Sequence, residues 1–322
     1  MTAQLKSPTL WAEEGFSVAR EQFVLKNAKV ETLQASQGQL DVQENNENIR
    51  VNGENFQIVI NKSKGTMVSW TQNNNELLKG PLEPYFWKPA NDNQKRNNYN
   101  NRLGPWKKAG AELVVKQIEA TQQGNFVKVH CLMDLYNAAD YTLDYTINSK
   151  GQIQVQADYK PRQSSIPLMP KFGMRVQIKD SFNKISWYGR GPEENYPDRK
   201  TGYLISLYES DLDNFITSYV APQDNANRCD VRWFSLADQN GNKIHVTGLQ
   251  PLCFRAWPYT EDDLEKAKHP FELPVRDFIN LNIDLNIHGV GGNDAWGART
   301  MDQYTIDGNK PYNYGFILEY KQ

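Results

Sequence analysis

Phe278–Ile287 reads FINLNIDLNI, and this stretch decides the fold class of the chain. Apolar and polar residues alternate strictly along it: Leu281, Ile283, Leu285 and Ile287 on one side, and Asn280, Asn282, Asp284 and Asn286 on the other. Successive side chains of a β-strand point to opposite faces, so this alternation is typical of a strand with one apolar and one polar face. It predicts an antiparallel sheet whose polar face contacts solvent.

The same composition recurs along most of the chain. Runs rich in β-branched and aromatic residues occur at 56–60, 126–136, 141–147, 152–159, 174–178, 184–189, 243–249 and 312–320. Turn sequences rich in Asn and Gly separate them, such as NSKGQ and DQNGNK. The best helix is Thr260–Lys268, where Thr260 can cap the first turn and Pro270 follows the last. We therefore predict an all-β fold, a large antiparallel β-sandwich with a few short helices.

A glycine-rich loop, HGVGGNDAWG at His288–Gly297, directly follows the deciding strand. Gly289, Gly291 and Gly292 free the backbone for tight turns. Trp296 ends the loop, at a position where an indole is hard to bury. An exposed indole offers a flat apolar face, which makes this loop the first candidate for a binding site.

The overall composition limits the classes of partner. The chain has 322 residues and a net charge of −2, with no run of five Lys or Arg residues. We therefore expect neither nucleic acid nor a membrane as partner. The polar N-terminus, MTAQLKSPTLWAEEG, has no apolar core of a signal peptide. Either the chain stays inside the cell or its natural N-terminus lies elsewhere, so the compartment remains open between cytoplasm and periplasm.

The metal-ligating residue types are sparse and scattered. Cys131, Cys229 and Cys253 form no CxxC pair, and two of them lie among apolar strand residues, which predicts buried, reduced thiols. The four histidines show neither HxH nor HExxH spacing. We therefore predict no metal site in this chain.

Two polar segments stand out between the predicted strands. The block WYGRGPEENYPDRKTG at 187–202 is dense in charge, and we interpret it as a loop held by Arg–carboxylate pairs and proline turns. The alternative is a catalytic loop, in which acids and cations come from Glu193, Glu194, Asp198, Arg190 and Arg199. Residues 85–106 have no apolar period between Pro89 and Leu103 and predict a long polar loop bracketed by aromatic residues. A loop of this length is either a functional lid or disordered.

Five blocks in order resemble the C-terminal end of the large β-galactosidases of glycoside hydrolase family 2. They are LWAEEGFSVAREQFVL, PANDN with PWKKAG, GRGPEENYPDR, SYVAPQDNANRCDVRWFSL, and LNIDLNIHGVGGNDAWG. The resemblance implies that residues 1–35 are the terminal strands of an immunoglobulin-like domain and that 36–42 are a linker. Residues 43–322 would be the fifth domain, a supersandwich similar to galactose mutarotase.

The resemblance also implies where the chemistry lies. The family's two catalytic glutamates and its active-site magnesium lie in a (β/α)₈ barrel, which this chain lacks. We therefore expect no catalytic residue and no cofactor here, with Mg and Na bound by other domains of the parent enzyme. Asn46-Glu47 and Asn75-Glu76 superficially match a catalytic Asn-Glu pair, but they lie in polar turns.

By the same resemblance, the substrate-binding candidates are Trp296, Asn293 and Asp294. Trp296 would stack on the substrate over the barrel mouth, Asn293 and Asp294 would brace the loop through its own amides, and the three glycines would support it. The family's mobile loop falls around 94–103, and its candidates here are Asp92, Asn93 and Arg96. QKRNNYNNRL departs from better-known members in being more basic and richer in Asn.

These implications lead to one main hypothesis and two alternatives. The chain would be part of a retaining β-galactosidase, inactive alone, whose partners are a β-galactoside, the parent's remaining domains and further copies in a homo-oligomer. A stand-alone carbohydrate-binding or mutarotase-like module is the first alternative; a mutarotase needs a histidine and a glutamate facing one pocket. A purely structural scaffold with Trp296 buried in a domain contact is the second.

Overall fold

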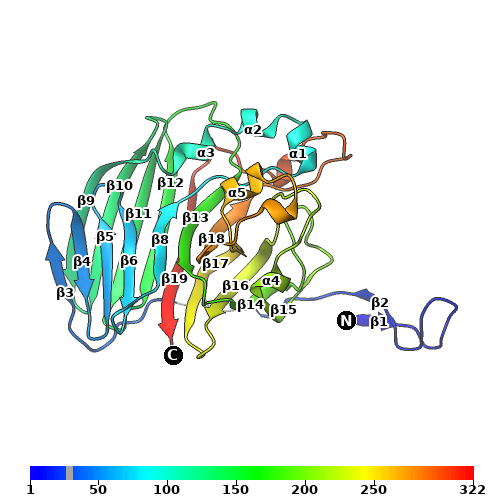
Figure 1. Ribbon diagram of the computed structural model, residues 1–322, viewed down its shortest axis with the longest axis horizontal. Coiled ribbons are helices and arrows are strands. Elements are labelled where there is room, and N and C mark those ends of the chain that lie inside the picture. The colour runs from blue at the N-terminus through cyan, green and yellow to red at the C-terminus, as the bar shows by residue number, and fades with distance from the viewer. Residues whose placement is uncertain (27–31) are drawn as a thin grey trace.

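The computed structural model describes residues 1–26 and 32–322, and within them the chain is nearly all β (Figure 1). The strands are β1 (Thr2–Gln4), β2 (Ser17–Arg20), β3 (Asp41–Glu44), β4 (Asn48–Asn52), β5 (Phe56–Asn61), β6 (Thr66–Gln72), β7 (Asn75–Glu76), β8 (Leu78–Pro84), β9 (Val114–Gln123), β10 (Phe126–Leu135), β11 (Ala139–Asn148), β12 (Ile153–Pro161), β13 (Lys171–Lys179), β14 (Lys184–Gly191), β15 (Leu204–Asp211), β16 (Arg228–Ala237), β17 (Lys243–Trp257), β18 (Phe278–Ile287) and β19 (Tyr312–Lys321). Every pairing between them is antiparallel, which confirms the predicted fold class.

The helices are short: α1 (Asp92–Arg96), α2 (Tyr99–Arg102), α3 (Trp106–Ala109), α4 (Leu212–Phe215) and α5 (Glu261–Lys266), with 3₁₀ turns η1 (Pro270–Glu272) and η2 (Asp302–Tyr304). The predicted helix is α5, capped by Thr260 as expected, although it ends at Lys266 and not at Lys268. Residues 85–106 were predicted as a polar loop and instead contain α1 and α2, with α3 beginning at Trp106. Buried Tyr99 and Trp106 hold these turns onto the sandwich.

Two layers share the long strand β17. One layer runs β9-β10-β11-β12-β19 and reaches the first half of β17, residues 243–248. The other runs β3-β4-β5-β6-β8-β13-β18 and reaches its second half, residues 253–257. β16 flanks both halves of β17 and continues through β14 to β15. One continuous apolar core fills the space between the layers.

β18 corrects one expectation about the deciding stretch. Its apolar residues face the core as predicted, but Asn280, Asn282 and Asp284 are also fully buried, so the predicted solvent-exposed face is wrong for most of the strand. Asn286 alone among the four polar positions is exposed. Charged side chains from α5 and β13 satisfy these buried groups: Glu261 accepts from Asn280 and Asn282, and Lys171 donates to Asn282 and Asp284.

The first residues form a separate two-stranded sheet. β1 pairs only with β2, and Figure 1 shows this hairpin projecting away from the two layers. Both strands lie within residues 1–35, where the resemblance implies terminal strands of a preceding domain. The assignment of residues 1–35 to a preceding domain, including 27–31 outside that part, and of 36–42 to a linker remains a prediction.

Candidate functional site

The glycine loop after β18 carries Trp296 at the end of the sandwich occupied by α1 (Figure 1). The Trp296 side chain is 81% exposed, as expected for an indole at a loop tip. Asp294 braces the loop as predicted, because its Oδ1 accepts hydrogen bonds from the backbone N–H of Trp296 at 2.8 Å and of Ala298 at 3.2 Å. Asn293, predicted to do the same, makes no such bond among the described residues.

Helix α1 holds the end of the loop that contains Trp296. Asn93 Oδ1 accepts from the Gly297 N–H at 2.8 Å, and Asn93 Nδ2 donates to the Ala298 carbonyl at 2.9 Å. The Arg96 guanidinium lies over the Trp296 ring, 5.2 Å from its centroid, in cation–π geometry. Two of the three predicted mobile-loop candidates therefore contact the glycine loop directly.

The third candidate, Asp92, faces a different segment. Its backbone N–H donates to Gln223 Oε1 at 3.2 Å, which joins α1 to the loop that precedes β16. A capping box at Asn91, with Gln94 as the reciprocal partner, starts the helix. Sequence reasoning did not single out Gln223 or Asn91.

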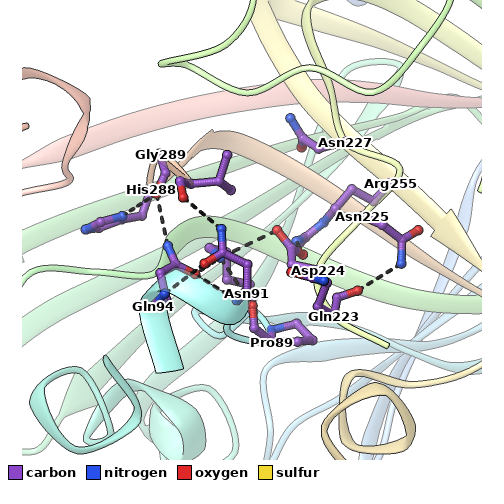
Figure 2. Close-up of polar contacts among 12 residues, drawn as sticks. Pro89, Asn91, Gln94, Gln223, Asp224, Asn225, Asn227, Arg255, His288 and Gly289 are labelled. Atoms are coloured by element: carbon purple, nitrogen blue, oxygen red, sulfur yellow. Dashed lines mark hydrogen bonds and ion pairs between the residues drawn. The ribbon is translucent and has the colours of Figure 1, made fainter. Parts of the chain in front are cut away.

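The base of the glycine loop is fixed from below by buried side chains. Figure 2 shows Gln94 reaching Gly289, where Gln94 Nε2 donates to the Gly289 carbonyl at 3.0 Å. Asn91 Nδ2 donates to the Val290 carbonyl at 2.7 Å. Gln94 in turn accepts from Lys88 Nζ at 2.8 Å. These bonds connect the loop to the charged interior.

Asp198 holds the loop from the other side. Its Oδ1 accepts from the Val290 N–H at 3.1 Å, and its Oδ2 accepts from the Gly291 N–H at 2.6 Å. Asp198 belongs to the charged block 187–202, which we interpreted as a structural loop with a catalytic loop as the alternative. No sequence pattern indicated this contact, because the bonded residues are more than ninety positions apart.

The three glycines of the loop serve close approach and not unusual backbone angles. A Cβ atom on Gly289 would lie 2.7 Å from Asp198 Cγ, and one on Gly292 would lie 2.5 Å from the Ala298 carbonyl oxygen. None of the three has a positive φ, whereas Gly297 does, at +115°. These glycines therefore support the loop by leaving room for the Asp198 side chain and for the backbone at Ala298.

The rest of the charged block is held as interpreted. Glu194 is buried and accepts from Arg199 at 2.6 Å, from the Ala226 N–H at 2.8 Å and from the Tyr219 hydroxyl. Arg190 pairs with Asp230 at 2.5 Å. These contacts account for the density of charge without a catalytic role.

A balanced set of buried charges lies beneath the site. Arg255 and Asp224 form an ion pair with neither side chain exposed, and Lys88 Nζ lies 3.5 Å from Asp224 Oδ2 (Figure 2). Burial lowers the pKa of Lys88, and the attraction of Asp224 offsets this only in part. For Arg255 burial also opposes the charged form, but Asp224 and Asp284 outweigh it and raise its pKa above the ordinary value. The pairing keeps charge in an interior that would otherwise exclude it.

Asn46-Glu47 and Asn75-Glu76, the two pairs that superficially match a catalytic Asn-Glu, have structural roles. Asn75-Glu76 forms the short strand β7, so its prediction as a turn is wrong; Glu76 Oε1 accepts from the backbone N–H groups of Trp70 and Leu78, each at 3.0 Å. Glu47 is exposed on the turn between β3 and β4. Cys131, Cys229 and Cys253 are buried and free, which confirms the prediction of reduced thiols.

The histidines are dispersed and engaged in local contacts. His130 bonds Asp144 at 2.6 Å, His245 bonds Ser235 at 2.7 Å and exposed His269 bonds Glu272 at 3.1 Å. His288 is buried, and burial lowers its pKa to about 4.

Residues 1–26 and 32–322 contain no group of three or more His, Cys, Asp or Glu side chains placed to hold a metal ion. The location of Mg and Na in other domains of a parent enzyme stays a prediction. Across the same residues, the helices are all too short or too polar to cross a bilayer.

Comparison with solved structures concerns the fold. A galactose 1-epimerase from Lactobacillus acidophilus superposes with a TM-score of 0.50 at 7% identity, covering 88% of this chain and 98% of that one. A putative mutarotase from Salmonella typhimurium gives 0.50 at 9% identity, covering 88% and 94%. At such identities the likeness shows a galactose mutarotase-like fold and nothing about activity.

Comparison of sequences identifies relatives. A β-galactosidase from Priestia megaterium is 33% identical over 321 residues, and one from Lactobacillus delbrueckii subsp. bulgaricus is 30% identical over 321 residues. Each match covers 99% of this chain but only 31% of the relative. The family model described as β-galactosidase small chain matches residues 52–318. The chain therefore belongs to the β-galactosidase small chain family.

Proposed function

We propose that this chain is the C-terminal part of a glycoside hydrolase family 2 β-galactosidase and supplies Trp296 as a stacking platform for the substrate. The observation that carries the proposal is an exposed indole on a loop whose backbone is fixed by hydrogen bonds from Asp294, Asn93, Asn91, Gln94 and Asp198. A ring held in this way presents an apolar face at a low cost in conformational entropy, which suits the C–H face of a pyranose.

The remaining parts of the parent would supply the chemistry. A retaining glycosidase needs two carboxyl groups about 5–5.5 Å apart. Glu47 is an exposed turn residue, and Glu76 accepts from the backbone N–H of Trp70, so neither glutamate is available as one of the two catalytic carboxyl groups. We therefore expect the 322-residue chain to be inactive alone and active only with the domains that carry the catalytic glutamates.

The test compares two exposed tryptophans. The purified chain is assayed with an aryl β-galactoside, alone and after mixing with the polypeptide that carries the rest of the parent. We expect no hydrolysis alone, hydrolysis with both parts, and a loss in kcat/KM of about tenfold for Trp296→Ala, which corresponds to about 1.4 kcal/mol. Trp11→Ala is the matched control, because Trp11 is 66% exposed but lies in the N-terminal hairpin segment.

Two results would contradict the proposal. One is hydrolysis by the chain alone at a rate that Trp296→Ala leaves unchanged after contamination has been ruled out. The other is equal activity of the Trp296→Ala and Trp11→Ala variants in the two-part enzyme. Faster mutarotation of fresh α-galactose by the chain, measured by polarimetry, would instead favour the mutarotase-like alternative that the shared fold suggests.

A further inference from the structure

Two polar side chains from distant parts of the sequence hold opposite ends of the glycine loop. Asp198, in the charged block, bonds the backbone N–H groups of Val290 and Gly291 at the start of the loop. Asn93, on α1, bonds Gly297 and Ala298 at its end. Trp296 lies between the two attachments, so its backbone position depends on both.

The contacts of Asp198 are built into the loop and not incidental to its surface. A carboxylate that accepts from two consecutive backbone N–H groups forms charge-assisted hydrogen bonds, which are stronger than neutral ones. A Cβ atom on Gly289 would lie 2.7 Å from Asp198 Oδ2, so glycine is needed there for this approach, and one on Gly291 would make a tight contact at 3.1 Å. A side chain at 289 or 291 would push the carboxylate away from the amides.

Asp198 is itself held in a fixed turn. Tyr196 and Arg199 exchange backbone hydrogen bonds across it, at 3.2 and 2.8 Å. Arg199 is paired with buried Glu194 at 2.6 Å. The charged block thus holds Asp198 in a rigid turn.

We propose that Asp198 and Asn93 are positioning residues that preset the glycine loop, so that Trp296 is already in its stacking orientation before a galactoside arrives. This inference rests on the proposed function in naming the galactoside, but the positioning itself can be measured without any sugar. Arg96 adds to it by covering one face of the indole, which leaves the other face for a ligand.

The test measures backbone amide exchange in the peptide that contains residues 288–298, using the whole 322-residue chain. Asp198→Asn removes one acceptor and Asn93→Ala removes both bonds of that side chain, so we expect exchange of this peptide to become at least tenfold faster in each variant. Glu193→Gln and Asn100→Ala are matched controls, because both side chains are exposed and make no side-chain hydrogen bond in the described chain. Their exchange should equal that of the wild type.

A third variant approaches the same contact from the other side. Gly291→Ala places a methyl group against Asp198 and should reproduce the faster exchange, and combining it with Asp198→Asn should add little. Because this variant leaves Asp198 in place, a folding defect of Asp198→Asn would not prevent the test. In the two-part enzyme, these variants should raise KM for the aryl galactoside several-fold while changing kcat less.

The outcomes separate the inference from the proposed function. Exchange in Asp198→Asn, Asn93→Ala and Gly291→Ala equal to that of the controls would overturn positioning, whatever the hydrolysis data show. Faster exchange together with full activity of Trp296→Ala would support positioning of the loop but contradict the platform. Faster exchange with a raised KM supports both.

Discussion

β12 and β18 have the same alternating sequence pattern and opposite surroundings. On β12, Ile153 and Val155 face the core, while Gln154 and Gln156 on the other face are partly exposed. On β18 the apolar residues also face the core, but Asn280, Asn282 and Asp284 are completely buried on the opposite face. Alternation identifies which residues share a face, and the comparison shows that it does not identify what covers that face.

The cover over β18 consists of charged groups from other elements. Lys171, on β13, donates to Asp284 at 2.7 Å and also to Asn282. Glu261, the first residue of α5, accepts from Asn280 and Asn282 at 3.0 Å each. The asparagines thus serve as hydrogen-bonding partners for buried ions, which is how an interior face can remain polar.

The pKa values of Lys171 and Glu261 reflect two opposing effects, burial and ion pairing. Burial lowers the pKa of Lys171 to about 8, with Asp284 opposing the shift. Burial pushes the pKa of Glu261 upward, but Arg175, Lys171 and Arg255 together outweigh it and leave the value below normal. Both groups are therefore charged at neutral pH, and each needs its partners.

The largest expected effect comes from removing one buried charge. Lys171→Met leaves Asp284 and Asn282 without their donor in a dry interior, and should lower the free energy of unfolding by about 3–5 kcal/mol. Lys160→Met, at an exposed position of β12, is the matched control and should change the free energy of unfolding by less than about 0.5 kcal/mol. Urea unfolding followed by circular dichroism measures both. Similar losses in the two variants would show that the two strands do not differ as described.

The second effect concerns acid and the residue that follows β18. The pKa of His288 in the folded chain is about 4, against an ordinary value of 6.5 for histidine. Between these values the unfolded chain binds the proton more readily, so the free energy of unfolding falls as pH drops from about 6.5 to 4, by up to about 3 kcal/mol. Lys88, Arg102 and Asp198 are the charged groups that also act on this histidine.

The measurement is the pH dependence of unfolding in paired variants. His288→Gln should remove this part of the slope between pH 7 and 4, because glutamine does not titrate. Asn100→Ala replaces an exposed side chain that does not titrate and should keep the slope of the wild type. An unchanged slope in His288→Gln would mean that the imidazole is not buried in the neutral form.

The smallest effect tests burial within β18 itself. Asn282→Ala should cost about 2 kcal/mol, because it leaves Lys171 and Glu261 each short of one hydrogen bond. Asn286→Ala, on the same face but exposed, should cost no more than about 0.5 kcal/mol. If chemical denaturation gave equal costs for the two asparagines, burial would not be what distinguishes these positions.

Local pattern was enough to predict β5, β10–β14, β17–β19 and helix α5, but it did not predict β3, β4, β6–β9, β15 or β16. FINLNIDLNI became β18 with the predicted bounds, and Thr260 caps α5. The short helices α1–α3 escaped prediction because turns of four or five residues carry no apolar period, and their stability comes from buried Tyr99 and Trp106. Such support is tertiary and leaves little trace in sequence.

For the site, the exposed tryptophan could be predicted from the sequence, but the residues that hold its loop could not. An indole after three glycines indicated an exposed ring, and Trp296 is exposed. Asp198 could not be connected to the loop, since an aspartate between Pro197 and Arg199 has many ordinary roles in a charged turn. The buried face of β18 was equally hidden, because only the fold decides that α5 lies over it.

The position of β19 has a consequence for how the chain is made. Tyr312–Lys321 lies between β12 and β17 and pairs with both. During synthesis, therefore, neither neighbour can complete its hydrogen bonding until residue 321 has emerged from the ribosome. Until then β12 exposes an unpaired edge that is prone to association with other chains. Completion of both layers therefore depends on one strand that lies far along the chain from β12, so the pairing that joins the layers at β19 forms late in folding.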